Sequence, residues 1–226
     1  MEKHQFHGVV NENIKRPDPD LVRRFGELGT GQIADAMGAH GVMHREIKPL
    51  SPGMRVAGPA LTVLTRPGDA LFVVRGADCA QAGDVVVIDG GGVVDMCVIG
   101  DRIAYYLQAK RKVNGVVVDG SVRDARGLRE AGMPVFTRGV TPKVFGAQGP
   151  GAVNVPIACG GVPVNPGDII VGDDDGVVVV PLEDATRVLA LAEEHLAGEL
   201  RRLAQVNQGM RLGDVQKIAD RIARWQ

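Results

Sequence analysis

The sequence predicts a mixed α/β protein that ends in a helical arm, and three patterns support this class. Apolar runs such as Val85–Ile88 and Val116–Val118 alternate with helical segments in the middle of the chain, as in βαβ units. Apolar strands separated by Pro-Gly and Asp-Gly turns follow. A long charged segment with helical spacing then begins at Glu183. We expect three parts: an N-terminal extension over residues 1–19, one domain over 20–181 and a helical arm over 182–226.

The first part of the domain is expected to hold two short helices and a strand. Apolar residues recur at helical spacing over 20–28, which predicts the first helix. Thr30 is expected to cap a second helix that runs to Met37. Val56–Leu64 is typical of a strand, in which Pro59 indicates an edge position or an irregular pairing because proline has no amide hydrogen.

The middle of the domain is expected to alternate strands with helices. We expect strands over 85–88, 116–118 and 135–136, a short helix or turn over 69–76, and helices over 101–112 and 124–131. Parallel strands connected in this way have their carboxyl ends at one edge of the sheet, where open α/β sheets bind their ligands.

The last part of the chain is expected to be antiparallel and then helical. Val153–Ala158, Ile169–Val171 and Val177–Val180 are typical of strands, and a helix from Glu183 to about Val206 follows them, with a short amphipathic tail. The sequence Asp173-Asp174-Asp175-Gly176 predicts a hairpin turn between the last two strands, and a metal site is the less favoured interpretation.

The composition narrows the function classes. The chain has 226 residues, of which 45% are hydrophobic, and a formal charge of only −1. It therefore lacks the basic excess that nucleic acids and anionic membranes attract, and neither is expected as a partner. Cys79, Cys97 and Cys159 are odd in number and far apart, which favours buried free thiols. No segment resembles a signal peptide or a membrane span, so we expect a cytoplasmic location.

The first candidate site follows a predicted strand that ends at Gly100. Asp101 is well placed to cap the helix that begins there, which would leave the backbone N–H groups of Arg102, Ile103 and Ala104 without helical partners. A helix start of this kind can bind a small carboxylate or phosphate. A simple capping role for Asp101 is the alternative.

The second candidate site is Asp119-Gly120-Ser121-Val122-Arg123-Asp124, at the end of another buried strand. Arg123 could hold a carboxylate through two hydrogen bonds. Asp124 could hold a hard divalent cation whose other ligands are water. An ordinary ion pair with Arg126 or Arg129 is the alternative.

The two candidate sites follow neighbouring strands and should therefore lie close together. Together they would bind an α-keto acid, with its carboxylate at the helix start and Arg123 and its keto oxygen at a cation on Asp124. A cation there stabilises the enolate that forms when a bond beyond the keto carbon breaks. Retro-aldol cleavage and β-decarboxylation both pass through this enolate.

These residues resemble the motif of class II pyruvate aldolases, the 4-hydroxy-4-methyl-2-oxoglutarate / 4-carboxy-4-hydroxy-2-oxoadipate aldolase group of the RraA-like family. Gly100-Asp101 and residues 119–124 carry the resemblance, and matches at 52–60, 166–168 and 171–181 extend it over roughly residues 20–209. The resemblance implies a three-layer β/β/α swivelling-type fold. It also implies a homotrimer or homohexamer with active sites between subunits.

For the metal, the resemblance implies Mg²⁺ or Mn²⁺ bound directly by Asp124. Asp101 would act through metal-bound water. A glutamate on the arm of a neighbouring subunit would complete the water shell, and Glu199 is the best match for it, with Glu194 second.

For the substrate, the resemblance implies that Arg123 anchors the pyruvyl group and that the amides of Arg102, Ile103 and Ala104 contact its carboxylate. This chain has one more residue between Asp101 and Arg123 than the family usually has. We expect the loop around residues 112–115 to absorb it.

The expected activity is therefore cleavage of 4-hydroxy-2-oxo acids to pyruvate and a second oxo acid, with oxaloacetate decarboxylation as a side activity. A non-catalytic regulator that binds a ribonuclease is the main alternative, and that branch of the family tends to lose the acid found here as Asp124. A methyltransferase is suggested only by Asp89-Gly90-Gly91-Gly92, which lacks a further glycine. Metal binding by His40 and His44 is disfavoured because Gly41 separates them.

Overall fold

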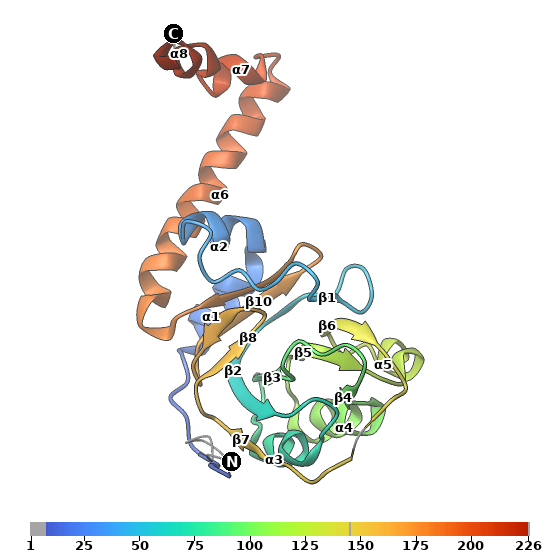
Figure 1. Cartoon of the computed structure of the whole chain (residues 1–226). Helices are drawn as coiled ribbons and strands as arrows, with labels where there is room; N and C mark the ends of the chain where they lie inside the picture. Colours follow the sequence, from blue (N-terminus) through green and yellow to red (C-terminus); the bar gives the residue numbers. More distant parts are fainter. Residues whose placement is uncertain (1–7, 145, 226) are drawn as a thin grey trace.

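The computed structural model describes residues 8–144 and 146–225, and it shows a sheet-based body from which an arm projects (Figure 1). In these residues a mixed sheet runs in the order β1-β6-β5-β3-β2-β10-β11, with β4 beside β5 and β7 beside β2. Its antiparallel and short strands are β1 (Lys48–Pro49), β4 (Cys97–Ile99), β7 (Gly151–Val153), β10 (Ile169–Asp173) and β11 (Gly176–Val180). Its parallel part consists of β2 (Val56–Thr65), β3 (Val85–Asp89), β5 (Gly115–Val122) and β6 (Val135–Val140). The mixed α/β class predicted from the sequence is confirmed.

Helices cover one face of the parallel strands. They are α3 (Leu71–Cys79), α4 (Asp101–Tyr106), its continuation as a π-helix (Leu107–Arg111), and α5 (Ala125–Ala131). Leu107 and Leu128 of this layer are buried against strand residues such as Ile88 and Val118. Burial of these apolar side chains is the main force that holds the helices on the sheet.

Other strands cover the second face of the parallel sheet. Successive side chains of a strand point to opposite faces, so each parallel strand also presents apolar side chains on this second face. Val87 and Val117 pack there against Ile170 and Val177 of the antiparallel pair β10 (Ile169–Asp173) and β11 (Gly176–Val180). The layers are therefore helices, parallel strands and antiparallel strands, which is the β/β/α layering that the resemblance implied.

The predicted hairpin between β10 and β11 is confirmed, since Asp173 pairs with Gly176 across the turn. The aspartates of this turn bind the protein's own backbone. Asp173 accepts from the N–H of Thr30 at 2.8 Å, and Asp174 accepts from the N–H of Gly53 at 2.8 Å. These contacts agree with a structural turn rather than a metal site.

The strand predicted over 153–158 is wrong, because the chain breaks there into β7 (Gly151–Val153) and β8 (Ile157–Cys159). Asn154 between them has the left-handed value φ 55° and exchanges two hydrogen bonds with Asn11, at 2.9 and 2.7 Å. Asparagine tolerates this conformation better than most residues. β8 then forms a separate two-stranded sheet with β9 (Val162–Val164).

Of the two alternatives predicted for Pro59, the irregular pairing is confirmed: Pro59 lies opposite Ile169 of β10, and pairing with β3 begins only at Ala60. The other alternative, an edge position, does not hold, because β2 lies between β3 and β10. A second local prediction is wrong. Thr30 is not a helix cap. Gly29 is the cap of α2 (Thr30–Ala36), and the Thr30 hydroxyl donates to Asp173 at 2.7 Å.

The C-terminal arm begins with α6 (Ala185–Asn207), as predicted. Its first turns pack with α1 (Pro19–Glu27) and α2 on the outer face of β10 and β11, where Val188 and Leu189 are buried. Its second half extends away from the body and carries α7 (Leu212–Val215) and α8 (Ile218–Ile222) at its end (Figure 1). The remaining elements are β1 (Lys48–Pro49), the short 3-10 helix Leu182–Asp184 and the 3-10 turn Ala223–Trp225.

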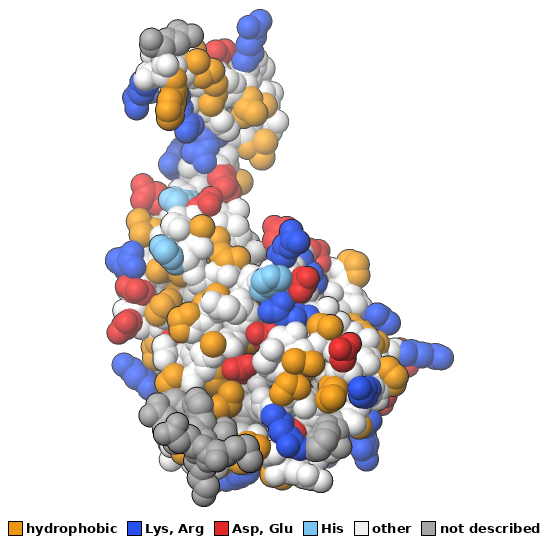
Figure 2. Space-filling view, viewed as in Figure 1, with side chains coloured by type: hydrophobic (Ala, Val, Ile, Leu, Met, Phe, Trp, Pro, Cys, Tyr) orange, Lys and Arg blue, Asp and Glu red, His pale blue; other side chains and the backbone are white. Residues whose placement is uncertain are grey.

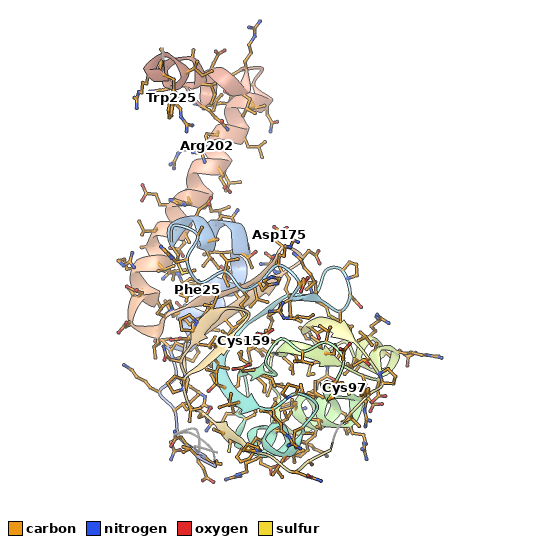
Figure 3. All side chains as sticks on the ribbon, viewed as in Figure 1. Phe25, Cys97, Cys159, Asp175, Arg202 and Trp225 are labelled. Carbon is orange, nitrogen blue, oxygen red and sulfur yellow. The ribbon has the colours of Figure 1, made fainter. Side chains whose placement is uncertain are left out.

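Apolar side chains remain exposed along the projecting part of the arm, among basic ones (Figure 2). Leu200 and Leu203 are more than half exposed, and Trp225 near the end of the arm is 92% exposed (Figure 3). Among the described residues, none of the helices combines the length and the apolarity needed to cross a membrane.

Candidate active site

The two candidate sites meet in one cleft. β4 (Cys97–Ile99) pairs in parallel with the end of β5, and the N–H of Arg123 donates to the carbonyl of Ile99 at 3.0 Å. This pairing brings the start of α4 against the turn that carries Arg123 and Asp124. Gly100, Asp101, Arg102, Ile103, Arg123 and Asp124 all line the resulting cleft, whose volume is about 560 Å³.

Asp124 is held in an unusual backbone conformation at the centre of this arrangement. Its φ of 56° is left-handed, a conformation that L-residues other than glycine adopt uncommonly and that clusters at functional sites. Its Oδ2 lies 3.3 Å from Nε of Arg123 and 3.4 Å from the amide nitrogen of Asp101. The side chains of Arg123 and Asp124 remain 32% and 39% exposed, so both are accessible to a ligand.

The start of α4 differs by one residue from the prediction. Gly100 is the cap residue, and Asp101 is the first residue of the helix. The N–H of Ala104 therefore donates to the carbonyl of Gly100 at 3.2 Å and is already used, and Ala104 itself is buried. A substrate carboxylate could reach the amides of Arg102 and Ile103, whereas the amide of Ala104 does not offer the free N–H that we expected.

Asp101 lies between the cleft and α5. It lines the cleft, and its Oδ2 would be 3.3 Å from a Cβ atom built at Gly127, near the start of α5. The carboxyl groups of Asp101 and Asp124 thus belong to the same cleft, as the motif predicted.

Glu199 and Glu194 lie elsewhere on the same chain. Both are on α6 and line a second hollow with Asp35, where Oε2 of Glu199 accepts from Nε2 of Gln32 at 2.8 Å. The arm, marked by Arg202, and the cleft, marked by Cys97, are far apart in Figure 3. A role for Glu199 in the cleft thus requires the neighbouring subunit that we predicted, and it stays a prediction.

The donor set of the cleft suits a cation that keeps most of its water. Across residues 8–144 and 146–225, no three His, Cys, Asp or Glu side chains converge as a metal cage would require. One accessible carboxylate, Asp124, with a second, Asp101, in the same cleft is the kind of site that Mg²⁺ uses with several waters. His44, which we considered as a metal ligand, instead lies 2.9 Å from Nη1 of Arg138.

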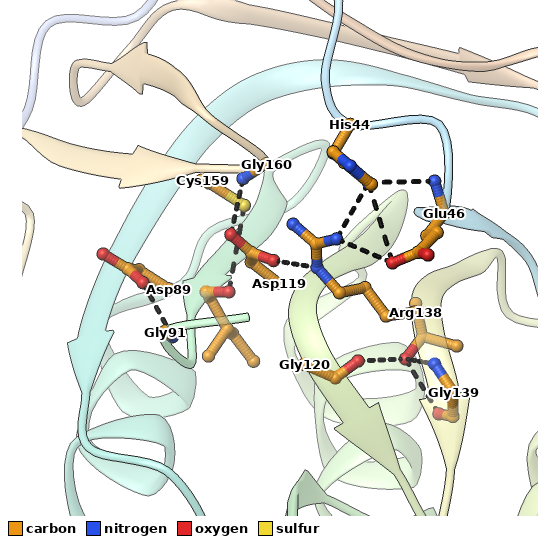
Figure 4. Close-up of polar contacts among 12 residues, drawn as sticks. His44, Glu46, Asp89, Gly91, Asp119, Gly120, Arg138, Gly139, Cys159 and Gly160 are labelled. Atoms are coloured by element: carbon orange, nitrogen blue, oxygen red, sulfur yellow. Dashed lines mark hydrogen bonds and ion pairs between the residues drawn. The ribbon is translucent and has the colours of Figure 1, made fainter. Parts of the chain in front are cut away.

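Sequence reasoning missed a second polar network, shown in Figure 4. Asp119, at the end of β5, is almost fully buried and pairs with Nε of Arg138, while its Oδ2 accepts from the N–H of Gly160 at 2.7 Å. Arg138 also contacts Glu46 at 3.1 Å. The Asp-Gly pair at 119–120 was part of the recognised motif, but its partners come from distant segments that no local pattern connects to it.

This network anchors the backbone just before the cleft. The N–H groups of Gly90 and Gly92 both donate to the carbonyl of Asp119 at 3.1 Å, so the glycine-rich turn binds β5 and does not present these amides to a methyl-donor cofactor. Burial raises the pKa of Asp89, and the nearby Asp119 adds to this effect. Burial likewise raises the pKa of the Cys159 thiol well above its usual range.

Three buried, free cysteines are present in the described residues, as predicted. Cys97 is one of them and lines the cleft. Burial raises the pKa of its thiol, and the positive charge of Arg123 offsets only part of this effect. Cys97 is therefore a neutral wall residue rather than a nucleophile.

Comparisons with known proteins identify the family of this chain. The sequence profile of the RraA-like family, described as Aldolase/RraA, matches residues 30–179. A Halalkalibacterium halodurans protein named "Putative 4-hydroxy-4-methyl-2-oxoglutarate aldolase" is 39% identical over 189 residues, which cover 84% of this chain and 90% of that protein. The chain therefore belongs to the RraA-like family.

The fold is also found in solved structures, among them two that are similar to this chain in sequence as well. Streptomyces coelicolor RraAS2, described as an unusual member of the RNase ES inhibitor RraA protein family, is 34% identical with a TM-score of 0.75, over 84% of this chain and all of that chain. An uncharacterised protein from Pseudomonas syringae pv. tomato gives a TM-score of 0.78 at 27% identity, over 90% of this chain and all of that chain. Members of the family are thus named as an aldolase and as relatives of a ribonuclease inhibitor. The family alone does not distinguish these two functions, so the residues of the cleft are the basis for choosing between them.

Proposed function

We propose that this protein is a divalent-metal-dependent lyase that cleaves 4-hydroxy-2-oxo acids to pyruvate and a second carbonyl compound. Substrates of the 4-hydroxy-4-methyl-2-oxoglutarate or 4-carboxy-4-hydroxy-2-oxoadipate type are the first to test, and oxaloacetate decarboxylation is the expected side activity. The observation that carries the proposal is the convergence of Arg123, Asp124 and the start of α4 in one accessible cleft.

Different residues of the cleft would bind the substrate and the metal. Arg123 binds the carboxylate of the pyruvyl group, assisted by the amides of Arg102 and Ile103, and so fixes the orientation of the keto group. Asp124 would hold Mg²⁺ or Mn²⁺ directly, while Asp101, and Glu199 of a neighbouring subunit, would hold it through water. When bound, the cation supplies Lewis-acid stabilisation of the negative charge that develops on the keto oxygen.

Bond cleavage needs a proton acceptor at the C4 hydroxyl. Asp101, which lines the cleft, would draw this proton through a water molecule. The C3–C4 bond then breaks, C4 becomes a carbonyl carbon, and the bonding electrons pass to the pyruvate fragment as an enolate, which gains a proton at C3. Loss of CO₂ from oxaloacetate forms the same enolate, which is why one cleft can serve both reactions.

Pyruvate release from 4-hydroxy-4-methyl-2-oxoglutarate and from oxaloacetate, measured with added Mg²⁺ or Mn²⁺ and again with a chelator, tests the proposal. We expect release that depends on the metal with both compounds. Purified protein that releases no pyruvate from either compound would favour a binding-only regulator instead.

A further inference from the structure

Strand β5 changes its neighbour just before it reaches the cleft. It pairs with β3 as far as Asp119, which lies opposite Asp89, and with β4 from Ser121 onward. On its other side, Asp119 and Gly120 of β5 lie opposite the single residue Arg138 of β6. An extra residue of this kind is a β-bulge, which bends a strand and often re-aims side chains beside an active site. The turn of the candidate active site begins directly after β5, so its direction depends on this bulge.

The backbone of the bulge is bound by groups outside the regular ladder. A bulge leaves backbone groups without ladder partners. The carbonyl of Asp119 accepts from the N–H groups of Gly90 and Gly92 at 3.1 Å. The carbonyl of Gly120 accepts from the hydroxyl of Thr137 at 2.9 Å. These partners belong to the same chain, so the contacts do not depend on a neighbouring subunit.

A buried ion pair joins the bulge to the turn between β8 and β9 (Figure 4). Nε of Arg138 donates to Oδ1 of Asp119, whose Oδ2 accepts from the N–H of Gly160 at 2.7 Å. The side chains of Arg138 and Asp119 are only 12% and 7% exposed. Nη1 of Arg138 also lies 2.9 Å from Nδ1 of His44 and 3.1 Å from Oε2 of Glu46. The guanidinium is thus fixed from two sides, and Asp119 is fixed with it.

The other titratable neighbours of Asp119 cannot replace the charge of Arg138. Asp89 lies opposite Asp119, whose charge helps to raise the pKa of Asp89. The same charge adds to the effect of burial in raising the pKa of the Cys159 thiol. A carboxylate left there without Arg138 would have to move towards water or take up a proton. Either response would weaken the contact that holds the bulge against Gly160.

We propose that Asp119 and Arg138 are positioning residues of the reaction proposed above, because their ion pair fixes the bulge of β5 and so sets the positions of Arg123 and Asp124. Neither belongs to the described residues that line the cleft, so they act through the backbone and not on the substrate. The N–H of Arg123 donates to the carbonyl of Ile99 at 3.0 Å only if β5 runs beside β4. A shift of the bulge would therefore move the carboxylate anchor and the metal ligand together. This inference rests on the proposed function.

Binding measurements separate positioning from stability, because an affinity belongs to each folded molecule and does not depend on how many molecules are folded. Arg138→Met removes the guanidinium and keeps much of the apolar side chain. We expect it to bind Mn²⁺, and pyruvate in the presence of Mn²⁺, each about 10-fold more weakly than wild type, as is typical when a residue that orients a metal ligand is lost. Electron paramagnetic resonance of free Mn²⁺ and calorimetry with pyruvate measure the two affinities.

Arg16→Met is the matched control, because Arg16 and Asp84 form another buried Arg–Asp pair. Their atoms are 2.8 Å apart, and the side chains are 21% and 0% exposed. Asp84 precedes β3, at the opposite end of that strand from Asp89. Removal of one partner of a buried pair destabilises a protein, so both variants should melt below wild type. Only Arg138→Met should lose affinity, and equal affinities in the two variants would overturn the inference.

The double variant Asp119→Asn/Arg138→Met serves if the single variant does not fold, because it leaves no unpaired buried charge. It should show the same loss of affinity, and wild-type affinities in it would overturn the inference. That result would leave the proposed function standing if wild type releases pyruvate from its substrates. Wild type that binds Mn²⁺ and pyruvate but cleaves no substrate would contradict the proposed function alone. Wild type that binds neither would overturn both.

Discussion

A Cβ atom at position 100 would lie 2.5 Å from Oδ2 of Asp124, so any residue other than glycine there would have to push that carboxylate aside. The φ of Gly100 is −135°, a value open to any residue, which means that the requirement is for space and not for backbone freedom. The amide nitrogen of Asp101 lies 3.4 Å from the same oxygen. The carboxylate of Asp124 therefore sits at the amino end of the helix, where the helix dipole favours negative charge.

Gly100→Ala is expected to displace the carboxylate of Asp124 and to lower pyruvate release about 100-fold, which corresponds to about 2.7 kcal/mol. Steady-state kinetics and the melting temperature of the same preparation check this. Gly31→Ala in α2 is the control, because a Cβ there meets nothing within 4 Å. Full activity in Gly100→Ala would show that the position of Asp124 does not matter.

Arg123→Ala is expected to raise KM and to lower kcat, because the guanidinium would hold the pyruvyl carboxylate both before and during bond cleavage. Loss of charge-assisted hydrogen bonds predicts a fall in kcat/KM of roughly 10- to 100-fold. Arg126→Ala is the control, since its side chain is 91% exposed and pairs with Glu130. If KM and kcat of the Arg123 variant matched those of the control, Arg123 would not be the anchor.

Stability is expected to depend on pH through Asp69, which precedes α3 and ties it to residues 148–149. Burial alone would raise the pKa of this carboxyl group. Three backbone N–H donors and the charge of Arg66 lower the pKa by more than burial raises it, so the pKa in the folded protein lies below the usual value. The stabilisation is therefore complete above the unfolded pKa of about 3.9 and is lost as the pH falls through the lower folded value.

Asp69→Asn should consequently lower the melting temperature at pH 7, by roughly 4–8 °C for about 2 kcal/mol, and the gap to wild type should narrow below about pH 4. Thermal melts across pH 3–7 measure this gap, with Asp95→Asn at an exposed position as the control. A gap that stays constant with pH would show that the charge of Asp69 is not responsible.

The arm is expected to be a contact between subunits. Leu200 and Leu203, three residues apart on α6, are 58% and 55% exposed, and they follow Glu199, which we predict to reach a neighbour's cleft. Replacing both leucines by glutamate should lower the molar mass in light scattering from that of a trimer or hexamer towards a monomer and reduce activity with it. Wild-type protein that is monomeric at micromolar concentration would refute this prediction.

The parallel half of the fold could be predicted from the sequence because its signals are local. Apolar runs such as Val116–Val118 and the helical spacing after Asp101 depend on neighbours within one element. The pairing of β10 with β2 depends instead on residues about 110 positions apart, such as Gly58 and Ile170. No periodic pattern within a local stretch of sequence indicates such a pairing. The partners of Asp119 were missed for the same reason.

The predicted start of α4 was wrong by one residue, because the prediction relied on the preference of aspartate for the cap position. Aspartate is normally a better cap than glycine, but a side chain at position 100 would displace the carboxylate of Asp124 from the position it has here. The extra residue before Arg123 was expected in the loop around 112–115, and a π-helix ends directly before that loop, at Arg111. A π-turn, with its i→i+5 hydrogen bonds, holds one more residue than an α-turn.

The central claim is that a divalent cation on Asp124 makes the cleft catalytic, and pyruvate release by Asp124→Ala, measured beside wild type over a Mg²⁺ or Mn²⁺ titration, tests it most directly. We predict that wild-type release rises with the metal and stops on chelation. Asp124→Ala should melt within a few degrees of wild type and release no pyruvate above background at any metal concentration. Near-normal, metal-dependent turnover by Asp124→Ala would contradict the claim.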